Sequence, residues 1–243
     1  IVLYMLVGAM QLGIMYLLAF RAYLYLTVSE FLLFTVFTPL YITLIYDLLS
    51  GRKLRWGYLL SAALAVLGAA IIRYDKVSDH FWTGLLLVQL SNLCFAIGMV
   101  GYKRLMEVRP MPQHNAFAWF YVGAFIVAVA AWFMLGNPQK LPTTTLQWSV
   151  LVWLGVVASG LGYFMWNYGA TQVDAGTLGI MNNVHVPAGL LVNLAIWQEQ
   201  PHWPSFISGA LVILASLWVH RRWVAPHSGQ TADDRRHGSA QSE

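Results

Sequence analysis

Eight apolar stretches run along this chain, and this pattern limits the fold more than any other feature of the sequence. They cover residues near 1–20, 28–49, 57–72, 82–102, 116–135, 148–168, 177–197 and 205–223. The hydrocarbon core of a lipid bilayer is about 30 Å thick, and an α-helix needs roughly 20 apolar residues to cross it. Backbone polar groups in lipid must also find their partners within the protein. The pattern therefore predicts an all-α membrane protein with eight transmembrane helices.

The distribution of charge supports this interpretation and indicates a topology. Only 10% of the residues are charged and 58% are hydrophobic, whereas a soluble domain has roughly 25% charged residues. The loops after the second, fourth and eighth stretches hold ten Lys and Arg residues, against four in the other loops. Because basic residues accumulate on the cytoplasmic side, both chain ends are predicted to be cytoplasmic, including a polar, disordered tail over 224–243. The net charge of +4 thus follows the topology and predicts no nucleic-acid partner.

The last three apolar stretches resemble the first three when the sequence is shifted by 148 positions. Two further stretches lie between the copies, so a complete five-helix unit over 82–223 follows the last three helices of a first unit over 1–72. Because five is odd, the second unit is predicted to be inverted relative to the first. Many secondary transporters have such inverted repeats and bind substrate at the repeat interface. The expected fold is a 5+5, ten-helix inverted repeat that lacks its first two helices.

Two prolines, Pro39 and Pro187, fall at equivalent positions of the two copies. A proline inside a helix removes one backbone hydrogen bond and weakens the helix at that point. We interpret the pair as hinges about which the two repeats rock during alternating access. A passive kink in each helix is the alternative.

Polar residues inside the apolar stretches mark helix contacts or cavities, because a polar group in hydrocarbon needs a partner. In the seventh stretch, Asn182 and His185 are three residues apart and share one helix face, while Asn183 points about 100° away. Pro187 follows them and frees a backbone carbonyl one turn earlier. The equivalent positions in the first copy are Phe34, Thr35 and Phe37. We interpret Asn182, Asn183 and His185 as substrate-binding residues; hydrogen bonding between helices is the alternative.

Three other stretches hold candidate substrate-binding residues. Trp166 and Tyr163 in the sixth stretch present aromatic faces on which a flat or apolar part of a substrate can stack. Asn92 in the fourth stretch and Gln11 in the first are polar groups within apolar segments, and we interpret them as cavity-lining. Ordinary helix packing is the alternative for Trp166, Tyr163 and Asn92.

Glu30 is the only carboxylate near the outer half of an apolar stretch. It is expected to bind a proton or a cationic substrate, or to pair with Arg21 on the same side of the membrane. The hydrolase motifs HExxH and GxSxG do not occur in the sequence. The single cysteine, Cys94, permits no disulfide within the chain. The sequence therefore predicts no enzyme, no metal site and no cofactor.

Five segments carry a resemblance to a known transporter family. They read RAYLYLTVSE, TPLYITLIYD, RPMPQHNAFAWFY, NYGATQVDAGTLGIMNN and HVPAGLLVNLAIW, over residues 21–30, 38–47, 109–121, 167–183 and 185–197. These segments resemble the EamA-domain group of the drug/metabolite transporter superfamily and, within it, the biotin importers of bacterial inner membranes. The resemblance implies a multi-pass inner-membrane transporter with a central cavity between its repeats. It also implies two helices before Ile1, without which we expect the 243-residue chain to be inactive.

Biotin, the substrate that this resemblance implies, has chemical groups that the candidate residues match. Its ureido ring offers two N–H donors and one carbonyl, which the amides of the candidate asparagines complement. Its apolar thiophane ring and valeryl chain suit the aromatic residues of the sixth stretch, and its carboxylate needs a donor or cation such as His185. An aromatic amino acid fits the same residues. Export of amino acids, amines or related metabolites is therefore the alternative function.

Overall fold

The computed structural model describes residues 1–26, 31, 34–51, 56, 60, 63–64, 81–197, 203–219 and 222. In this part of the chain the regular elements are helices and no strand occurs, which confirms the all-α class. Three expectations lie outside the described residues: the span over 57–72 apart from isolated positions, the role of Glu30, and the tail over 224–243.

Four described helices are long and apolar enough to cross a membrane. They are Val2–Ala22, Trp82–Val108, Gln113–Leu135 and Thr145–Ala170. These helices match the first, fourth, fifth and sixth predicted spans. Thr38–Leu49 and Ala210–Val219 are shorter apolar helices, which lie within the second and eighth predicted spans. The total of eight transmembrane helices and the inverted repeat stay predictions.

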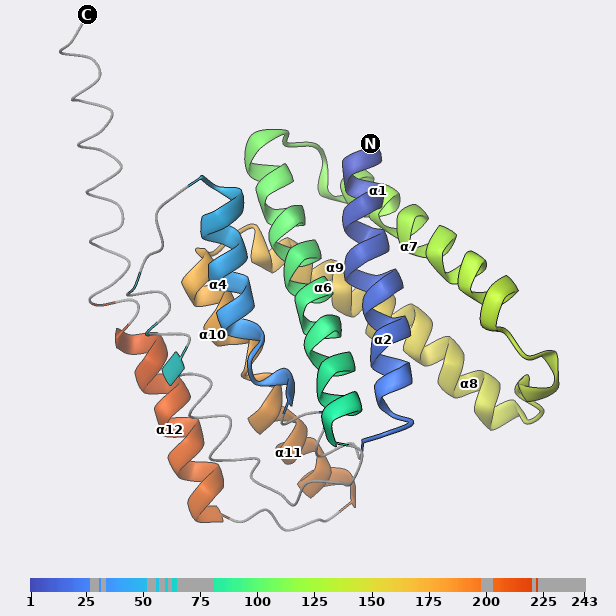
Figure 1. Ribbon diagram of the computed structural model, residues 1–243. Helices are drawn as coiled ribbons and strands as arrows, with labels where there is room; N and C mark the ends of the chain where they lie inside the picture. Colours follow the sequence, from blue (N-terminus) through green and yellow to red (C-terminus); the bar gives the residue numbers. More distant parts are fainter. Residues whose placement is uncertain are drawn as a thin grey trace, which may run out of the picture. The chain divides into compact units, whose positions relative to one another are not determined.

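The chain forms two compact units, and each takes a part of both predicted repeats. The first comprises Ile1–Leu26 and Ser78–Asp174, and the second comprises Thr27–Val77 and Ala175–Glu243. The first unit contains α1 (Val2–Gly8), η1 (Ala9–Ile14), α2 (Met15–Ala22), α6 (Phe81–Val108), α7 (Gln113–Leu135), η2 (Pro138–Lys140), α8 (Thr145–Trp153), η3 (Leu154–Gly162) and α9 (Tyr163–Ala170) (Figure 1). The second unit contains α4 (Thr38–Leu49), α10 (Ala175–Asn182), α11 (His185–Trp197) and α12 (Trp203–Val219).

In the first unit, α1, η1 and α2 form one continuous helix, the first helix, which packs against α6 and α7 (Figure 1). Glycine permits the approach to α7. A Cβ on Gly8 would lie 1.8 Å from the carbonyl oxygen of Phe120, and a Cβ on Gly123 would lie 1.8 Å from that of Met5. Membrane helices commonly pack through such small residues. The buried core beside this crossing is rich in aromatic residues and includes Tyr4, Tyr102, Phe117 and Phe120.

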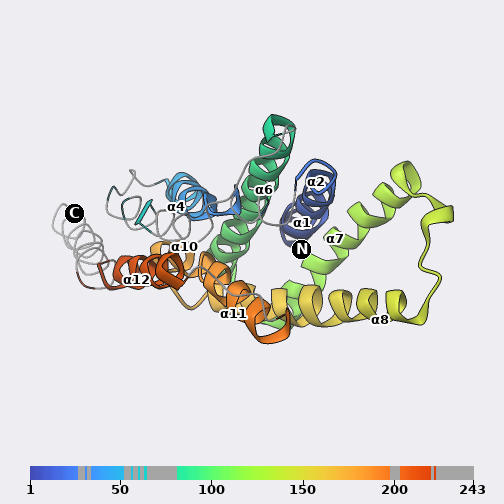
Figure 2. The same ribbon diagram turned by 90° about the horizontal axis from the view of Figure 1, so that it is seen from below.

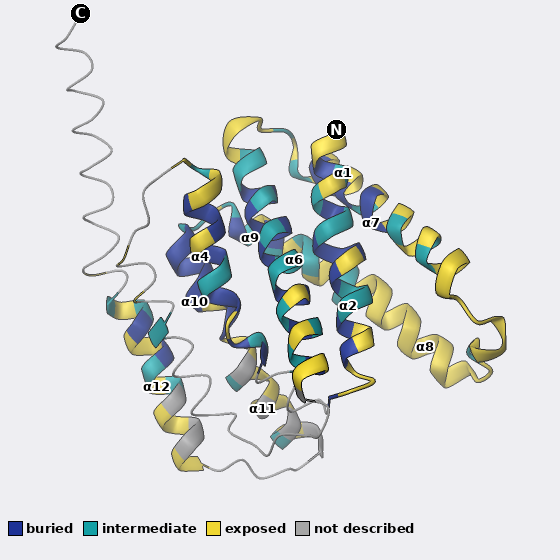
Figure 3. Ribbon diagram, viewed as in Figure 1, coloured by how far each residue is buried: buried dark blue, intermediate teal, exposed yellow. Residues whose placement is uncertain are grey.

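Helix α8 begins at a capping box, in which Thr144 and Gln147 satisfy each other's backbone N–H groups. No residue of α8 is buried (Figure 3), and α7 and α8 spread apart toward the loop that joins them (Figure 2). The exposed side chains are mainly apolar and include Leu146, Val150 and Leu151. An apolar surface of this kind is typical of a helix that faces lipid or a further membrane helix.

In the second unit, the seventh predicted span is two helices instead of one. Helix α10 ends at Asn182, a turn follows at Asn183–Val184, and α11 begins at His185. The break lies just before Pro187, which cannot donate to the carbonyl of Asn183, one turn earlier. The prediction that Asn182 and His185 share the face of one continuous helix is therefore wrong, because a turn separates them.

Two local irregularities recur at positions that the 148-residue shift brings together. A turn at Val36–Phe37 precedes α4, and it matches the turn at Asn183–Val184 to within one residue. The π-helical segment Ala9–Ile14 maps inside the second π-helical segment, Leu154–Gly162. Because π-helical turns concentrate at functional sites, the contact between the first helix and the η3–α9 helix is a candidate functional site.

Candidate functional site

A row of polar side chains joins the first helix to η3 and α9. Gln11 and Tyr16 lie on the first helix, and Ser159, Tyr163 and Asn167 follow at four-residue intervals along η3 and α9. Residues four apart share one helix face. Gln11 contacts Asn167 and Tyr16 contacts Ser159, as expected for an antiparallel pair. These five residues are named the polar seam.

The amide end of the polar seam consists of Gln11 and Asn167, which are both fully buried. Gln11 Nε2 donates a hydrogen bond to Asn167 Oδ1 at 3.2 Å. Gln11 Oε1 and Asn167 Nδ2 have no hydrogen-bond partner among the described residues. A buried polar group without a partner costs about 1–3 kcal/mol. The amide end thus keeps one acceptor and one donor unused, at a cost in stability.

Helix α6 packs against the amide end. A Cβ on Gly98 would lie 2.3 Å from Gln11 Cβ, so glycine is what lets α6 approach the first helix at this level. The next residue of α6, Met99, accepts a hydrogen bond at Sδ from Trp166 Nε1 at 2.9 Å. Trp166 directly precedes Asn167. The first helix, α6 and α9 therefore meet at one level around the two amides.

The hydroxyl end of the polar seam joins Tyr16, Ser159 and a tyrosine of α7. Tyr16 Oη and Ser159 Oγ are 3.3 Å apart. The Tyr121 hydroxyl donates to the backbone carbonyls of Ser159 and Gly160, which belong to the π-helical segment. Between the two ends, the Tyr163 ring lies edge-on to the Tyr16 ring, with the centroids 6.1 Å apart. Aromatic and hydroxyl contacts therefore position the irregular backbone.

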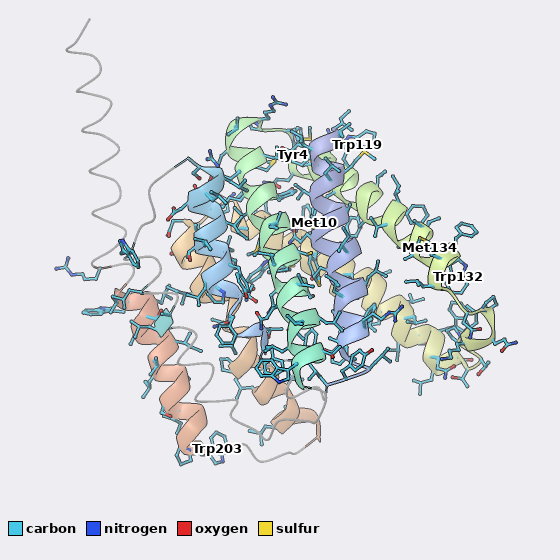
Figure 4. All side chains as sticks on the ribbon, in the orientation of Figure 1. Tyr4, Met10, Trp119, Trp132, Met134 and Trp203 are labelled. Carbon is cyan, nitrogen blue, oxygen red and sulfur yellow. The ribbon has the colours of Figure 1, made fainter. Side chains whose placement is uncertain are left out.

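A groove of about 510 Å³ opens beside the hydroxyl end, along the first helix and α7. Its wall is mainly apolar and includes Trp132 of α7 (Figure 4). Three hydroxyl-bearing residues, Tyr16, Tyr121 and Ser159, also line it. Small-molecule sites are typically pockets of about 300–1,000 Å³ with apolar walls and a few placed polar groups. The polar seam and this groove are thus suited to an amphipathic small molecule.

Replacing Tyr121 with Phe tests the hydroxyl end. The variant keeps the ring but removes the donor to two carbonyls of the π-helical segment. We expect the stability to fall by about 1 kcal/mol, the contribution of a typical hydrogen bond, as measured by thermal unfolding in detergent. Tyr168→Phe, at an exposed position of α9, is the matched control. Equal melting temperatures for the two variants would show that the Tyr121 hydroxyl contributes nothing.

The second unit holds the other predicted binding residues, which gather at its two helix breaks. His185 Nδ1 donates to the carbonyl oxygen of Asn182, and His185 Nε2 lies 3.5 Å from Thr35 Oγ1. Asn183 is fully buried, and its Nδ2 donates to the carbonyl oxygen of Val36 at 3.2 Å. Residues predicted to bind substrate therefore also tie the two turns together.

The predicted hinge residues lie next to these turns. Pro39 cannot donate to the carbonyl of Thr35, and the Thr38 hydroxyl donates to that carbonyl instead, at 2.6 Å. Helix α10 approaches closely here, because a Cβ on Gly179 would lie 3.3 Å from the Pro39 carbonyl oxygen. The Thr38 hydroxyl thus replaces the backbone bond that Pro39 removes. The hinge role of Pro39 and Pro187 stays a prediction.

The predicted site residues divide between the two units. The first unit contains Gln11, Asn92, Tyr163 and Trp166, and the second contains Asn182, Asn183 and His185. Asn92 is buried on α6. Their contacts with a substrate stay predictions.

The predicted site residues do not include four residues of this region, which are Tyr16, Tyr121, Ser159 and Asn167. One signal for this helix pair was available, since Ser159 occupies the position equivalent to Gln11 under the 148-residue shift. Polar residues thus stand at equivalent positions of both copies. The two tyrosines carry no comparable signal, because aromatic residues are common throughout membrane helices.

Comparison with known proteins covers nearly the whole chain. The model of the EamA-like transporter family matches residues 82–221. A biotin transporter of Escherichia coli (strain K12) is 83% identical over 241 residues, which make up 99% of this chain and 81% of that protein. A probable biotin transporter of Pseudomonas aeruginosa is 53% identical over 219 residues, 89% of this chain and 76% of that protein. A crystal structure with 19% sequence identity has a TM-score of 0.72, covering 88% of this chain and 74% of that chain, and it shows a shared fold.

Proposed function

The chain belongs to the EamA-like transporter family, and from this premise we propose that it moves biotin across the bacterial inner membrane by alternating access. The observation that carries the proposal is the 83% identity to a biotin transporter over 99% of the chain. At this identity, few positions remain at which the binding site of this chain can differ from that of the Escherichia coli protein. The chain is a transporter and not an enzyme, and the proposed direction of transport is uptake.

The chemistry of biotin suits the polar seam and its groove. Biotin has a polar ureido ring at one end, an apolar thiophane ring and valeryl chain, and a carboxylate at the other end. The polar seam offers amides at one end and hydroxyls at the other, and an apolar groove lies beside it. Polar groups inside membrane helices are costly and usually functional. We therefore place Gln11, Tyr163 and Trp166 among the substrate-binding residues.

The second unit holds three further candidate residues, His185, Asn182 and Asn183. Asn182 and Asn183 remain candidates for polar contacts with the substrate, and His185 remains a candidate either for the substrate carboxylate or for support of the turn between α10 and α11. Broken helices that line a substrate path are a recurrent feature of secondary transporters, because their ends present unpaired backbone groups and dipole charge. The turns before Pro39 and Pro187 are the proposed points of bending. Both chain ends are proposed to be cytoplasmic.

Uptake of labelled biotin at nanomolar concentration tests the function. The host lacks its own biotin importer and biosynthesis and expresses the protein under study. We expect saturable uptake that excess unlabelled biotin blocks. Absence of uptake with the protein correctly inserted in the membrane would overturn the proposal. Export of amino acids and amines would then be measured in the same cells.

His185 is expected to act mainly by holding the two turns. Its Nδ1–H bond to the Asn182 carbonyl can be replaced by the Nδ2–H of an asparagine, but not by alanine. We therefore expect His185→Ala to lower the initial rate of biotin uptake about tenfold, as for a hydrogen bond worth about 1.4 kcal/mol. His185→Asn should retain most of the rate. Equal losses in both variants would instead indicate that the imidazole itself contacts the substrate or carries a proton.

A further inference from the structure

We infer that Gln11 and Asn167 recognise the ureido ring of the substrate, which takes the place of the hydrogen bond between them. This inference rests on the proposed function, because it assigns one end of biotin to one end of the polar seam. It names two specificity-determining residues, one of which, Asn167, no pattern in the sequence had singled out as a binding residue.

The unused hydrogen-bonding atoms of the pair carry the inference. Gln11 Oε1 is an acceptor and Asn167 Nδ2 is a donor, and neither has a partner among the described residues, although both side chains are fully buried. A ureido group presents an N–H and a carbonyl side by side on one edge. Gln11 Oε1 can accept from that N–H while Asn167 Nδ2 donates to that carbonyl. If both amides are assigned in the opposite orientation, the complement is the same with the roles exchanged.

The surroundings of the pair favour recognition of a neutral polar ring. Leu12 is buried beside Gln11, and the Trp166 ring is held by its hydrogen bond to Met99 Sδ. In such a buried site, an amide without hydrogen-bond partners costs stability, and an amide with all its hydrogen bonds made is strongly favoured. The thioether and the indole are polarizable groups that also suit a sulfur-containing ring. A ligand that pairs with both amides and contacts this wall offsets the cost of separating them.

The backbone on each side of the pair is irregular where movement is needed. In this structure the two amides are closed against each other, so the ureido ring enters only when the first helix and α9 separate. Gln11 lies inside the π-helical segment Ala9–Ile14, and Leu154–Gly162 ends five residues before Asn167. π-helical turns are rare and occur frequently at functional sites, which favours these two segments as the places where the backbone adjusts to admit the substrate. The Gln11–Asn167 bond is therefore a contact that the substrate exchanges for its own.

The test compares biotin with 2-iminobiotin, in which a protonated guanidinium replaces the urea. Asn167→Asp removes the donor to the ureido carbonyl and supplies a carboxylate that pairs with a guanidinium. The variant keeps the bond from Gln11 Nε2, so the helix contact itself is preserved. We expect the KM for biotin uptake to rise about tenfold, the effect of one hydrogen bond, while 2-iminobiotin uptake improves. Desthiobiotin, which keeps the ureido ring, should lose uptake in parallel with biotin.

Three controls separate recognition from folding. Gln11→Met removes the acceptor for the ureido N–H and should raise the KM for biotin about tenfold, whereas Asn115→Asp places the charge of Asn167→Asp at an exposed position of α7 and should change nothing. On the unmodified protein, desthiobiotin should compete with labelled biotin about ten times better than 2-iminobiotin does, by the same hydrogen-bond estimate. Equal competition by the two analogues, or equal losses for biotin and 2-iminobiotin in Asn167→Asp, would overturn the inference. Absence of biotin uptake in the unmodified protein would instead overturn the proposed function.

Discussion

A Gly123→Ala variant is expected to lose much of its folded protein and its transport activity. The added methyl group would lie 1.8 Å from the carbonyl oxygen of Met5, on the backbone of the first helix, where no side chain can rotate away. The first helix must shift, and the shift disturbs the crossing at which Gly8 meets Phe120 in the same way. Overpacking of a well-packed core costs about 1–3 kcal/mol, and we expect the upper end of that range because backbone is involved.

The measurement is thermal unfolding in detergent together with the amount of protein in the membrane. Gly155→Ala is the matched control, because a Cβ on Gly155 meets no atom within 4 Å. Both variants make the same chemical change on a membrane helix, so a difference between them reports the close crossing alone. If Gly123→Ala and Gly155→Ala unfold at the same temperature, the first helix does not approach α7 as described.

A Lys103→Met variant is expected to loosen the connection that follows α9. Lys103 is buried near the end of α6, its Nζ donates to the Val173 carbonyl at 2.6 Å, and Nζ lies 3.2 Å from Glu107 Oε1. The same connection is held at Thr171, whose hydroxyl accepts from Gln113 Nε2 at 3.2 Å. A hydrogen bond to a charged group contributes about 1.5–3 kcal/mol. We expect a loss of about 2 kcal/mol and faster proteolysis between residues 171 and 174.

Arg104→Gln is the control for Lys103→Met. Arg104 also pairs with Glu107, but both side chains are partly exposed to solvent, and exposed ion pairs contribute about 0–1 kcal/mol. The two variants remove one positive charge each from adjacent residues, so the topology signal in the loop changes equally. An equal loss of stability in both would show that charge, and not the bond to the Val173 carbonyl, anchors the connection.

The sequence predicts the membrane-spanning helices better than it predicts the breaks within them. Long apolar runs predict the helices Val2–Ala22, Trp82–Val108, Gln113–Leu135 and Thr145–Ala170, because hydrocarbon leaves helical hydrogen bonding as the only local solution. At Pro187 the sequence predicted a hinge, with a passive kink as the alternative, but not the turn at Asn183–Val184. Pro187 marks the position, but a neighbouring helix decides whether the chain bends or unwinds. Here the Asn183 side chain and the Val36 carbonyl bind each other across the two turns.

In the candidate site too, the sequence predicts some features and only the packing of the helices decides others. Gln11 is a candidate site residue from the sequence alone, because an amide in an apolar stretch needs a partner in any fold that the chain adopts. The identity of that partner depends on which helices meet and at what level, and these contacts join residues 156 positions apart. The π-helical segments also have no composition that distinguishes them from α-helix, since they arise where packing shifts the backbone hydrogen bonds.

The sequence by itself determined that this chain is a helical membrane protein, roughly where four of its long helices lie, and which transporter family it resembles. Hydrophobic transfer and backbone hydrogen bonding are local requirements, so a linear pattern of residues records them. The tertiary structure alone decided that Asn167 is the partner of Gln11, that α6 approaches them through Gly98, and that Tyr121 holds the π-helical backbone. Such pairings depend on close packing between distant segments, where a difference of one atom allows or forbids the contact.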